Sequence, residues 1–509
     1  MSKKDLSEGC DFDDESGKND CFGCINFLFP IGCMYYEGKI DMEFKMKLPH
    51  QVDYVLDKLI KAGHKAYVVG GCVRDKIMNI EPHDYDICTS AEPNKVKELF
   101  KRTILTGEKH GTVTAIVGDM EIEITTYRTD GEYLDGRRPE TVEFSSNLRE
   151  DLKRRDFTIN AMAYNHEDGL IDLFGGREDI KNRTINPVGN AEDRIKEDYL
   201  RAMRAVRFSS QLDFLISDNL YFAIAKNSDL IYNVSNERIR DEFNKIMISE
   251  NVVIGIKYLD SLGLLDRIIP ELKDLKTTFQ NHPCHIGNSV WEHTLFALDV
   301  ISNNTMFRDS DYYSNYFYII EKLAILFHDI SKHLYKTTDE NMVDHFYEHA
   351  IYGSAIAESI MRRMKYENKM IETVKTLIFY HDYQVEPTKK SVKRLLSRIG
   401  AENFEHFCNI RFADISAQNK LLFKKRIEKI IDVIEIRNEI KELEECFQIK
   451  DLEINGNDLI ELGVKEGKQI GFVLKELLDF VIEDSENNTK EVLKNKAREI
   501  KEYNYVERD

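Results

Sequence analysis

The stretch Ala66-Tyr-Val-Val-Gly-Gly-Cys-Val-Arg-Asp75, followed closely by Asp84-Tyr-Asp86, sets the architecture of the first part of this chain. Ala66–Val69 is a short apolar run typical of a β-strand, and two glycines end it before a helical pattern begins near Val73. Glycines between a strand and a helix let the backbone approach a ligand closely. The N–H groups at the start of a helix then face an anion. We therefore predict a phosphate-binding turn, with Gly71 and Arg74 among its contacts.

Two carboxylates, Asp84 and Asp86, lie two residues apart in a stretch that we predict to be a strand over residues 84–89. Side chains alternate across a strand, so both carboxylates project from one face. Adjacent hard oxygen ligands suit Mg²⁺, which takes waters and substrate phosphates as its other ligands. Two such ions can hold the attacking and leaving oxygens of a phosphoryl transfer. Taken alone, the pair fits a solvated strand end equally well; with the glycines and Arg74 it predicts a nucleoside triphosphate site with two Mg²⁺ ions.

A second motif, Arg154-Arg-Asp-Phe-Thr-Ile-Asn-Ala-Met-Ala163, joins the first two. Together they resemble the class II tRNA nucleotidyltransferases, that is, the bacterial CCA-adding enzymes and their relatives the bacterial poly(A) polymerases. The resemblance runs from about Met46 to the C-terminus. It implies that Arg155 contacts the triphosphate, while Asp156 and Asn160 orient neighbouring groups and the ribose. Glu123 is either a third acidic group beside the metals or an ordinary carboxylate on a strand face.

The resemblance also implies a fold. We expect an α+β protein whose N-terminal nucleotidyltransferase domain has an antiparallel or mixed sheet with helices, followed by an all-helical neck, an HD domain and a tail. With 509 residues several domains are expected. The predicted boundaries are an extension at 1–45, the catalytic domain at 46–185, a nucleotide-selecting neck at 186–280, the HD domain at 281–420 and a tRNA-binding tail at 421–509.

The motif Glu197-Asp-Tyr-Leu-Arg201 continues to Arg204 and Arg207 in a stretch, residues 193–215, with helical character. Asp198 would then share one helix face with the three arginines. Cytosine and adenine both show an exocyclic amine beside an unprotonated ring nitrogen, which a carboxylate and a guanidinium can bind. Guanine and uracil have the opposite polarity and would leave these groups unpaired. The resemblance implies that Asp198 and Arg201 select CTP and ATP in this way; a surface salt-bridge stripe is the alternative.

Two further segments fit the same family. Residues 130–139 are polar and carry glycines, so they read as a mobile loop. They resemble the loop that accommodates the final ATP in CCA-adding enzymes, which favours full CCA addition or A addition. Residues 235–242 resemble the helix that braces the nucleotide pocket.

A separate group of metal-binding residue types lies in the middle of the chain: His293, His328, Asp329 and Asp414. This order resembles the all-helical HD metal-dependent phosphohydrolases. Imidazoles and carboxylates from different helices can hold a divalent transition metal or Mg²⁺ and activate a water on a phosphate ester. His349 and His381 are candidate ligands of a second metal. The alternative is a buried histidine set in a domain that has lost its chemistry.

The first 45 residues contain Cys10, Cys21, Cys24 and Cys33, and their irregular spacing leaves zinc binding, a disordered tail and a misassigned start all open. Nine cysteines without regular pairing, and no apolar run near the roughly 20 residues that span a bilayer, favour a cytoplasmic protein without a membrane partner.

The net charge of −19 is unusual for an RNA-binding protein, but local basic clusters such as residues 389–394 and 424–426 offer either an RNA path or an ordinary solvated face.

The sequence therefore predicts a template-independent enzyme that adds CCA to tRNA 3′ ends. The 3′-OH would attack the α-phosphate of CTP and then ATP, with release of pyrophosphate. One alternative is an A-adding enzyme or poly(A) polymerase. The other is an HD-domain phosphohydrolase that acts on RNA ends or nucleotides. The oligomeric state does not follow from the sequence.

Overall fold

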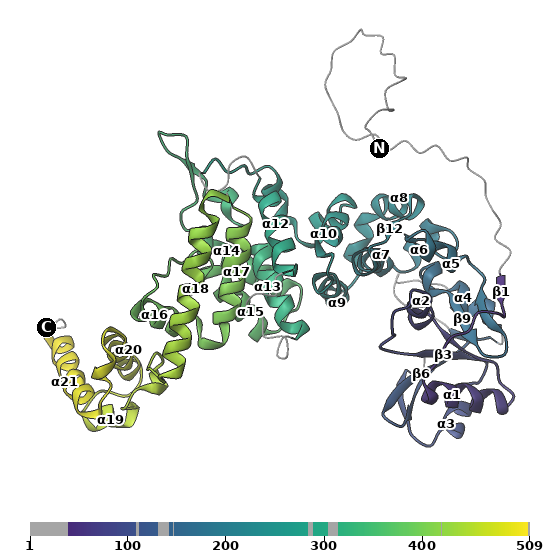
Figure 1. Ribbon diagram of the computed structural model, residues 1–509, viewed down its shortest axis with the longest axis horizontal. Helices are drawn as coiled ribbons and strands as arrows, with labels where there is room; N and C mark the ends of the chain where they lie inside the picture. The colour runs from purple at the N-terminus through teal and green to yellow at the C-terminus, as the bar shows by residue number, and fades with distance from the viewer. Residues whose placement is uncertain are drawn as a thin grey trace, which may run out of the picture. The chain divides into compact units, whose positions relative to one another are not determined.

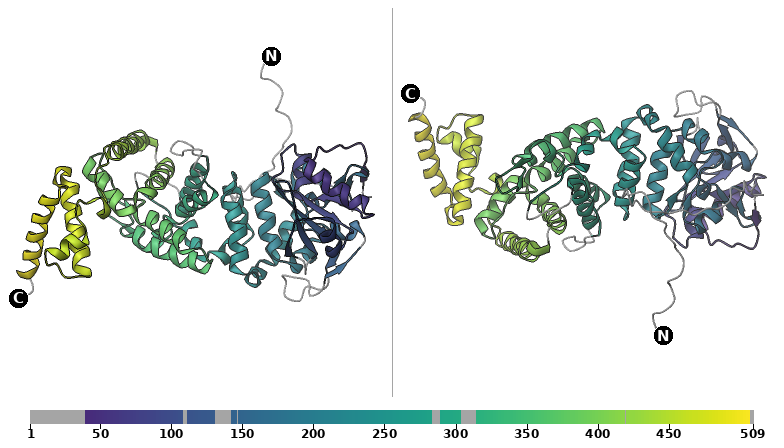
Figure 2. Two further views of the ribbon diagram at one scale, coloured as in Figure 1. Left: turned by 90° about the horizontal axis from the view of Figure 1, so that it is seen from below. Right: turned by 90° about the horizontal axis from the view of Figure 1, so that it is seen from above.

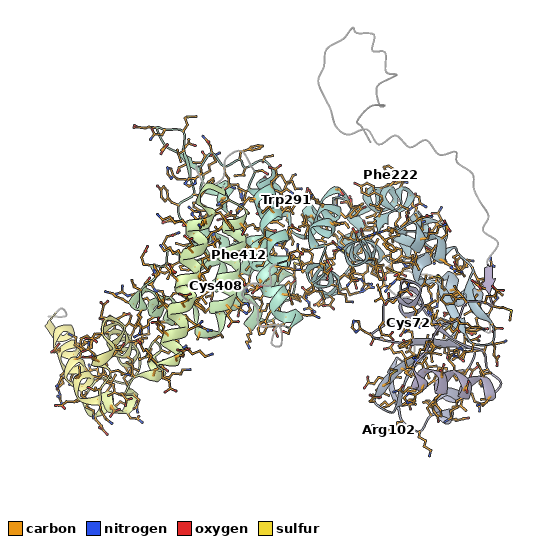
Figure 3. All side chains as sticks on the ribbon, viewed as in Figure 1. Cys72, Arg102, Phe222, Trp291, Cys408 and Phe412 are labelled. Atoms are coloured by element: carbon orange, nitrogen blue, oxygen red, sulfur yellow. The ribbon has the colours of Figure 1, made fainter. Side chains whose placement is uncertain are left out.

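The computed structural model describes residues 39–107, 111–130, 142–145, 147–282, 289–303, 314–418 and 420–506. The four cysteines of the N-terminal extension and residues 131–139 of the predicted loop lie outside the described residues. Among the described residues, the cysteines Cys72, Cys88, Cys408 and Cys446 are buried and form no disulfide. Figure 3 places Cys72 in the part of the chain that carries the sheet and Cys408 among the central helices.

One eight-stranded sheet dominates residues 39–185, which we call the sheet region. Its spatial order is β1-β10-β9-β2-β3-β6-β5-β4. Only β3 and β6 pair in parallel, so the sheet is mixed, as predicted. In this spatial order the strands are Lys39–Asp41, Gly169–Asp172, Met162–Asn165, Ala66–Val69, Asp86–Thr89, Met120–Thr126, Thr112–Val117 and Thr103–Gly107. A two-stranded ladder, β7 (Arg128–Asp130) with β8 (Val142–Phe144), stands beside it.

Each face of the sheet has its own hydrophobic core, because side chains alternate along every strand. Helices α1 (His50–Lys61) and α3 (Pro93–Leu99) cover one face, where Leu56 of α1 packs with Ile87 and Ile124 of the strands. On the opposite face, Leu152 of α4 (Leu148–Lys153) packs near Cys88. The alternation therefore places the side chains of Asp86 and Glu123 on the α4 face.

Two expectations for the sheet region were wrong in detail. Residues 39–41 were assigned to the extension, but they form β1, an edge strand whose backbone pairs with β10. The strand expected over residues 84–89 begins at Asp86, so Asp84 precedes it. The exposed–buried alternation nevertheless continues through Asp84, Tyr85 and Asp86, which keeps both carboxylates on one side.

The neck region, residues 186–280, is mainly helical. Its elements are α6 (Ala191–Glu197), α7 (Leu200–Leu212), β12 (Leu215–Ile216), α8 (Asp218–Lys226), η3 (Ser228–Asn233), α9 (Asn236–Met247), α10 (Val252–Ser261), α11 (Leu265–Ile268) and η4 (Pro270–Lys276). The prediction of an all-helical neck is therefore wrong at β12, whose backbone pairs in parallel with β11 (Thr184–Ile185) and fastens the neck to the sheet region.

The continuous helix expected over residues 193–215 is also wrong, because the chain breaks between α6 and α7. Asp198 is extended, with φ of −143° and ψ of 104°. Its Oδ1 accepts the Leu200 N–H at 3.0 Å, so a local side-chain hydrogen bond starts α7 in place of a continued helix.

The central helices are α12 (Val290–Asn303), α13 (Asn315–Phe327), α14 (His349–Arg363), α15 (Asn368–Tyr380), α16 (Lys389–Ile399), α17 (Phe404–Ser416) and α18 (Lys420–Glu442), with short turns η5 (Lys332–Leu334) and η6 (Ala401–Asn403) between them (Figure 1). A small hairpin, β13 (Thr337–Thr338) with β14 (Asp344–His345), corrects the expectation that this part is all helical. One hydrophobic cluster runs from the neck into these helices and includes Val433 and Ile440 of α18.

The last helices form a separate small core around Leu477 and Leu493. They are α19 (Gly456–Glu461), α20 (Lys468–Glu483) and α21 (Lys490–Val506), with η7 (Ile449–Asp451) and η8 (Ser485–Asn487); α20 and α21 lie side by side (Figure 2). Four basic side chains of α16, those of Lys389, Lys390, Lys393 and Arg394, pair with the carboxylates of Glu445 and Glu483. This favours ion pairing over a free basic path for residues 389–394. None of the described helices is long and apolar enough to cross a membrane.

Candidate active site

The predicted phosphate turn is a strand–turn–helix unit in which Gly70 is the constrained residue. It links β2 to α2 (Gly71–Ile77) with φ of 86°, a left-handed conformation that glycine adopts readily. A Cβ built on Gly70 would lie 3.1 Å from Nη1 of Arg155. The turn therefore needs glycine for two reasons, its backbone angle and the close approach of an arginine from the second motif.

Arg74 projects from α2 into a buried network. Its Nη1 donates to Asn160 Oδ1 at 2.8 Å, and its Nε and Nη2 donate to Asp75 Oδ1 at 2.8 Å and 2.7 Å. The guanidinium also lies over the Phe208 ring of α7, 5.3 Å from its centroid. Since a guanidinium has five N–H donors, these three hydrogen bonds leave two for a ligand.

Three carboxylates gather where the start of β3 meets the middle of β6. Asp86 stands directly opposite Glu123 in the parallel register, and Asp84 precedes Asp86 on the same side. The pKa of Asp86 is raised: loss of hydration is the main cause, and Glu123 and Asp84 add to it while Arg155 opposes it. Three adjacent hard oxygen donors that repel one another fit a divalent cation such as Mg²⁺.

Arg155 lies between this acidic group and the glycine turn. Its Nη2 is 3.5 Å from Oδ2 of Asp151, a carboxylate that is fully buried and also accepts hydrogen bonds from Arg154 at 2.9 Å and 2.8 Å. Among the described residues, the buried Nε of Arg155 has no hydrogen-bond partner. A buried donor without a partner is costly, so it marks a place where an anionic ligand would gain a contact.

The base-selection candidates Asp198 and Arg201 do not pair with each other. Arg201 Nη1 donates to Glu197 Oε2 at 2.6 Å and to the Arg194 carbonyl at 2.8 Å, and Nη2 donates to the Arg154 carbonyl at 3.3 Å. Asp198 Oδ2 accepts from Arg238 Nη2 at 2.8 Å. The protein thus fixes both groups and leaves each with unused hydrogen-bonding capacity.

The two other arginines of α7 pair with buried carboxylates from different elements. Arg204 Nε donates to Asp156 Oδ2 at 2.7 Å, and Arg207 Nη1 lies 3.1 Å from Glu242 Oε2 of α9. Burial disfavours the charged form of Asp156, but Arg204 outweighs it and lowers the pKa of Asp156 to about 2. Burial and the nearby Arg204 lower the pKa of Arg207 to about 10. The expected single stripe of four residues is therefore a set of separate ion pairs. The pair of Arg204 with Asp156 joins the neck to the sheet region, and the other three lie within the neck.

The sequence reasoning did not assign roles to several residues that hold the site. Asp151 anchors both arginines of the second motif, Glu197 fixes Arg201, and Arg238 and Glu242 of α9 pair with the polar residues around α7. Glu197 could have been found as the acidic neighbour of Asp198. The ion pairs of α9 could not have been found in this way, because no local sequence signal points to partners roughly forty residues away in the chain. The segment of α9 was expected to brace the pocket, but its ion-pair partners were not.

A second cluster lies among the central helices and joins all four predicted HD residues. His293 Nε2 is 3.3 Å from His328 Nε2 and 3.1 Å from Asp414 Oδ1, and His328 Nε2 is 3.1 Å from Asp329 Oδ2. All four side chains are buried. Burial opposes ionisation of Asp329, yet His328 and Lys332 hold its pKa well below the usual value.

His349 and His381 complete this cluster on the other oxygen of Asp329. Their Nε2 atoms lie 3.4 Å and 3.7 Å from Asp329 Oδ1 and 3.2 Å from each other. Two sets of three side chains, His293–His328–Asp329 and Asp329–His349–His381, thus share one carboxylate, and each set has the spacing of a metal site.

The hydrogen bonds of the four imidazoles show that this cluster suits cations. Each Nδ1 faces a backbone carbonyl, at 3.3 Å for His293, 2.7 Å for His328, 2.6 Å for His349 and 2.7 Å for His381. A carbonyl only accepts, so each Nδ1 carries a proton, and a ring in its neutral form then directs the lone pair of Nε2 inward. Facing lone pairs at 3.2–3.3 Å repel each other, and a bound cation would remove that repulsion.

Three family models match the chain. The poly A polymerase head domain matches residues 66–186, the "Probable RNA and SrmB-binding site of polymerase A" matches residues 213–276, and the tRNA nucleotidyltransferase domain 2 matches residues 321–497. The first covers the glycine turn, the carboxylates and the second motif, and the third covers most of the central helices.

Known CCA-adding enzymes are similar to the chain in sequence and structure. That of Ligilactobacillus salivarius is 34% identical over 465 residues, which cover 90% of this chain and 97% of the relative. That of Lactobacillus delbrueckii is 54% identical over 210 residues, so the match spans 41% of this chain and about half, 53%, of that relative. The crystal structure of the Bacillus stearothermophilus enzyme in complex with CTP has a TM-score of 0.66 at 27% identity and covers 91% of this chain and 100% of its own.

A Thermotoga maritima CCA-adding enzyme complexed with tRNA shares the fold, with a TM-score of 0.53 at 20% identity, covering 89% of this chain and 96% of its own. The similarity to the Ligilactobacillus enzyme extends over nearly the full length of both proteins. The chain belongs to the family of class II CCA-adding enzymes.

Proposed function

We propose that this chain adds CCA to the 3′ ends of tRNA from CTP and ATP without a nucleic-acid template. The 3′-OH of the RNA attacks the α-phosphorus of the bound triphosphate in line with the bridging oxygen to the β-phosphorus. A new P–O bond forms, the α–β phosphoanhydride bond breaks, and pyrophosphate leaves. Growth by three nucleotides repeats this step with CTP twice and ATP once.

Asp84 and Asp86 would hold two Mg²⁺ ions, with Glu123 beside them. When bound, the ions neutralise charge on the phosphates and assist loss of the 3′-OH proton. The support is chemical: three carboxylates lie together on two neighbouring strands, and the pKa of Asp86 is raised by lost hydration and by its acidic neighbours. These residues offer hard oxygen ligands and leave most coordination positions to water and phosphate, as Mg²⁺ prefers.

The triphosphate would lie along the glycine turn. Arg155 is the strongest candidate contact, because its buried Nε has no partner among the described residues. Gly71 would offer backbone N–H, and Arg74 the two N–H groups that its protein contacts leave open. The close approach of Arg155 to Gly70 brings these groups to one place.

The residues proposed to select the base give the strongest support to the proposed function. The single observation that supports it most is that Arg201 is fixed both to Glu197 and to the carbonyl of Arg154, next to the proposed triphosphate contact. A guanidinium held this way can donate to the unprotonated ring nitrogen of cytosine or adenine. Asp198, held by Arg238, can accept from the exocyclic amine. Arg204 and Arg207 would support this arrangement from the same helix.

Incubation of the protein with tRNA lacking CCA and with each nucleoside triphosphate separately tests the proposal. We expect CTP to be incorporated first and ATP only after two C residues. Incorporation of ATP alone would instead establish an A-adding enzyme or poly(A) polymerase. Asp84→Ala should abolish addition; addition that survives it would refute the assignment of the metal site.

A second activity is favoured by the buried histidine cluster. We propose that His293, His328, Asp329 and Asp414 hold a divalent metal ion, with His349 and His381 at a second position, and that the cluster hydrolyses phosphate esters of RNA ends or nucleotides. A bound metal would lower the pKa of a water for attack on phosphorus. The inward Nε2 atoms and the shared carboxylate of Asp329 support this. Hydrolysis that is lost in His328→Ala but retained in Asp84→Ala would separate the two activities.

The remaining proposals concern organisation. Apart from β1, which belongs to the sheet although residues 39–41 were assigned to the extension, the boundaries at 46–185, 186–280, 281–420 and 421–509 stay predictions, as does the role of the last segment in tRNA binding. Substrates such as tRNA and nucleoside triphosphates favour a cytoplasmic location.

A further inference from the structure

A group of aromatic residues without an assigned role surrounds a cavity beside the histidine cluster. The cavity lies around the start of α14 and the end of α15. Its volume of about 450 Å³ is in the range of sites that bind small organic molecules. We call it the aromatic pocket, because its lining includes Phe346, Tyr347, Phe379, Tyr380 and Tyr383.

The aromatic pocket meets the histidine cluster at His349, which lines the pocket and belongs to the cluster. The side chain of His349 is 10% exposed, compared with 1% for His293 and His328 and 3% for His381. His349 is therefore the most accessible of the four imidazoles. A ligand in the aromatic pocket would lie against the second set of candidate metal ligands.

The same turns of the backbone position the aromatic residues and the histidines. Nδ1 of His349 donates to the carbonyl of Phe346 at 2.6 Å, and Nδ1 of His381 donates to the carbonyl of Ile378 at 2.7 Å. Each hydrogen bond closes a turn that contains two adjacent aromatic residues of the pocket lining. The aromatic residues are therefore held in place relative to the imidazoles, as a substrate pocket beside a catalytic centre requires.

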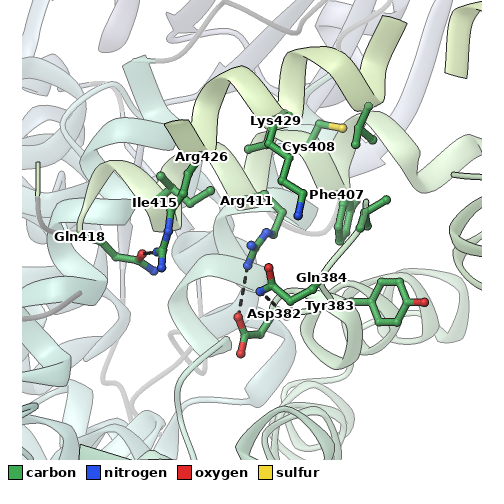
Figure 4. Close-up of a pocket in the computed structure, with 13 residues that line it drawn as sticks. Asp382, Tyr383, Gln384, Phe407, Cys408, Arg411, Ile415, Gln418, Arg426 and Lys429 are labelled. Carbon is green, nitrogen blue, oxygen red and sulfur yellow. Dashed lines mark hydrogen bonds and ion pairs between the residues drawn. The ribbon is translucent and has the colours of Figure 1, made fainter. Parts of the chain in front are cut away.

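Tyr383 and Arg398 add a ring and a guanidinium to the lining. Figure 4 shows the Tyr383 ring turned away from Arg411, whereas the carboxylate of Asp382 faces that arginine at 3.4 Å. The Tyr383 ring lies edge-to-face with Tyr380, with 5.9 Å between the centroids, and the Arg398 guanidinium lies 5.2 Å from its centroid. Among the described residues, no carboxylate pairs with the exposed Arg398, so its N–H donors are open to a ligand.

The aromatic pocket suits a planar uncharged group better than a phosphate. Its lining contains the carboxylates of Glu348 and Asp382 as well as Arg398, so it has no excess of positive charge. Aromatic rings stack with nucleobases of any sequence, and a guanidinium can donate to the edge of a base. The phosphate of the same nucleotide would then lie at the histidine cluster, where bound metal ions would supply positive charge.

We propose that the aromatic pocket is a nucleobase-binding site that serves the histidine cluster. Its ligand is a nucleoside monophosphate, either free or at the end of an RNA strand, with the base among Tyr347, Phe379 and Tyr380 and the edge of the base at Arg398. The proposal rests on the phosphohydrolase activity proposed above for the place of the phosphate, and it adds the residues that recognise the substrate. None of the described lining residues belongs to the sheet region or the neck, so the pocket is separate from the transferase site.

Fluorescence titration of the full chain with 2-aminopurine riboside 3′-monophosphate tests this site, because stacking on aromatic rings quenches the emission of this base. The probe lacks the triphosphate and the 3′-OH of transferase substrates. We expect saturable quenching in EDTA and tighter binding with Mn²⁺, which adds a contact for the phosphate. Tyr347→Leu and Arg398→Met should each weaken binding by about tenfold. A short RNA that ends in the same nucleotide should quench equally if the pocket takes RNA ends, and it should not bind if the pocket takes only free nucleotides.

Tyr232→Leu is the matched control, because Tyr232 is 68% exposed, as Tyr347 is, but lies in the neck. Its affinity for the probe should equal that of the wild type. The proposal is overturned if the wild type does not quench the probe at millimolar concentration, if Tyr347→Leu and Arg398→Met bind as tightly as the wild type, or if Asp198→Ala abolishes the quenching. Failure of the phosphohydrolase proposal looks different: no phosphate is released from the probe with Mn²⁺, while quenching still depends on Tyr347 and Arg398.

Discussion

Asp198→Asn is the substitution that tests base selection most directly. The Asp198 carboxylate accepts hydrogen bonds from the Leu200 N–H at 3.0 Å and from Arg238 at 2.8 Å. A carboxylate has about four acceptor positions, so about two remain for the amine of a base. An asparagine keeps one oxygen, enough for Leu200, but it presents an NH₂ group that cannot accept from the amine of cytosine.

The expected magnitude follows from one unmade hydrogen bond in a partly buried site. Leaving such a group unpaired costs about 1–3 kcal/mol, which corresponds to about 5- to 150-fold in kcat/KM. The same amide can donate to the carbonyl of uracil, so the ratio of kcat/KM for CTP over UTP should fall by at least about tenfold.

The assay measures incorporation of CTP and UTP into tRNA lacking CCA. Asp193→Asn makes the same chemical change at an exposed residue in the first turn of α6 and should leave the ratio unchanged. Arg238→Met removes the ion pair but keeps the carboxylate, so it should alter the ratio less than Asp198→Asn. A ratio that stays at the wild-type value in folded Asp198→Asn, or that falls equally in Arg238→Met, would refute the reasoning.

Three further predictions follow from particular contacts. Gly70→Ala should lower kcat/KM for CTP by more than about tenfold, because a Cβ there would displace Arg155. Gly63 is the control: its φ is nearly the same, +87°, but a Cβ built on it would meet no atom within 4 Å, so Gly63→Ala should retain activity. Asp156 has a pKa lowered to about 2 despite burial, so its ionised form contributes stability that is complete above about pH 4 and lost as the pH falls through about 2. Arg204→Met should therefore lower the free energy of unfolding by about 2 kcal/mol at neutral pH, and this free energy should decline less steeply below pH 4 in urea titrations. The control Arg183→Met removes an exposed ion pair and should change the free energy of unfolding by less than about 1 kcal/mol. With Asp84→Ala as the background, metal analysis should find two divalent ions per chain and one after His381→Ala; two ions in that variant would argue against the second position.

The sequence was most informative where the structure is local. The glycine turn, Arg74 and the two aspartates lie within 17 residues, and a strand followed by a tight turn and a helix brings such neighbours together without help from the rest of the chain. The histidine cluster was also predictable, because the order of its residues resembles that of the HD phosphohydrolases. Its division into two sets around Asp329 depends on how α12, α13, α14 and α15 pack, which no residue pattern encodes.

The break before α7 shows why the neck was harder to predict. The charges from Asp198 to Arg207 keep a helical spacing, so periodicity alone predicts one helix. The Asp198 side chain instead accepts the Leu200 N–H, and this local hydrogen bond competes with continuation of the helix. The partners of these charges, Arg238 and Glu242, come from α9 and become neighbours only in the folded protein.

The segment Arg154–Asp156 would link the proposed base selection to the chemistry of transfer, because its three residues contact three different parts of the proposed site. The carbonyl of Arg154 accepts from Arg201, and the carboxylate of Asp156 accepts from Arg204. Arg155, between them, approaches the glycine turn and opposes the rise in the pKa of Asp86. A base of the wrong polarity would displace Arg201, and through the Arg154 carbonyl that displacement reaches the proposed triphosphate contact. An incorrect nucleotide would therefore lose transfer rate as well as affinity, which is how a site without a template can reject it.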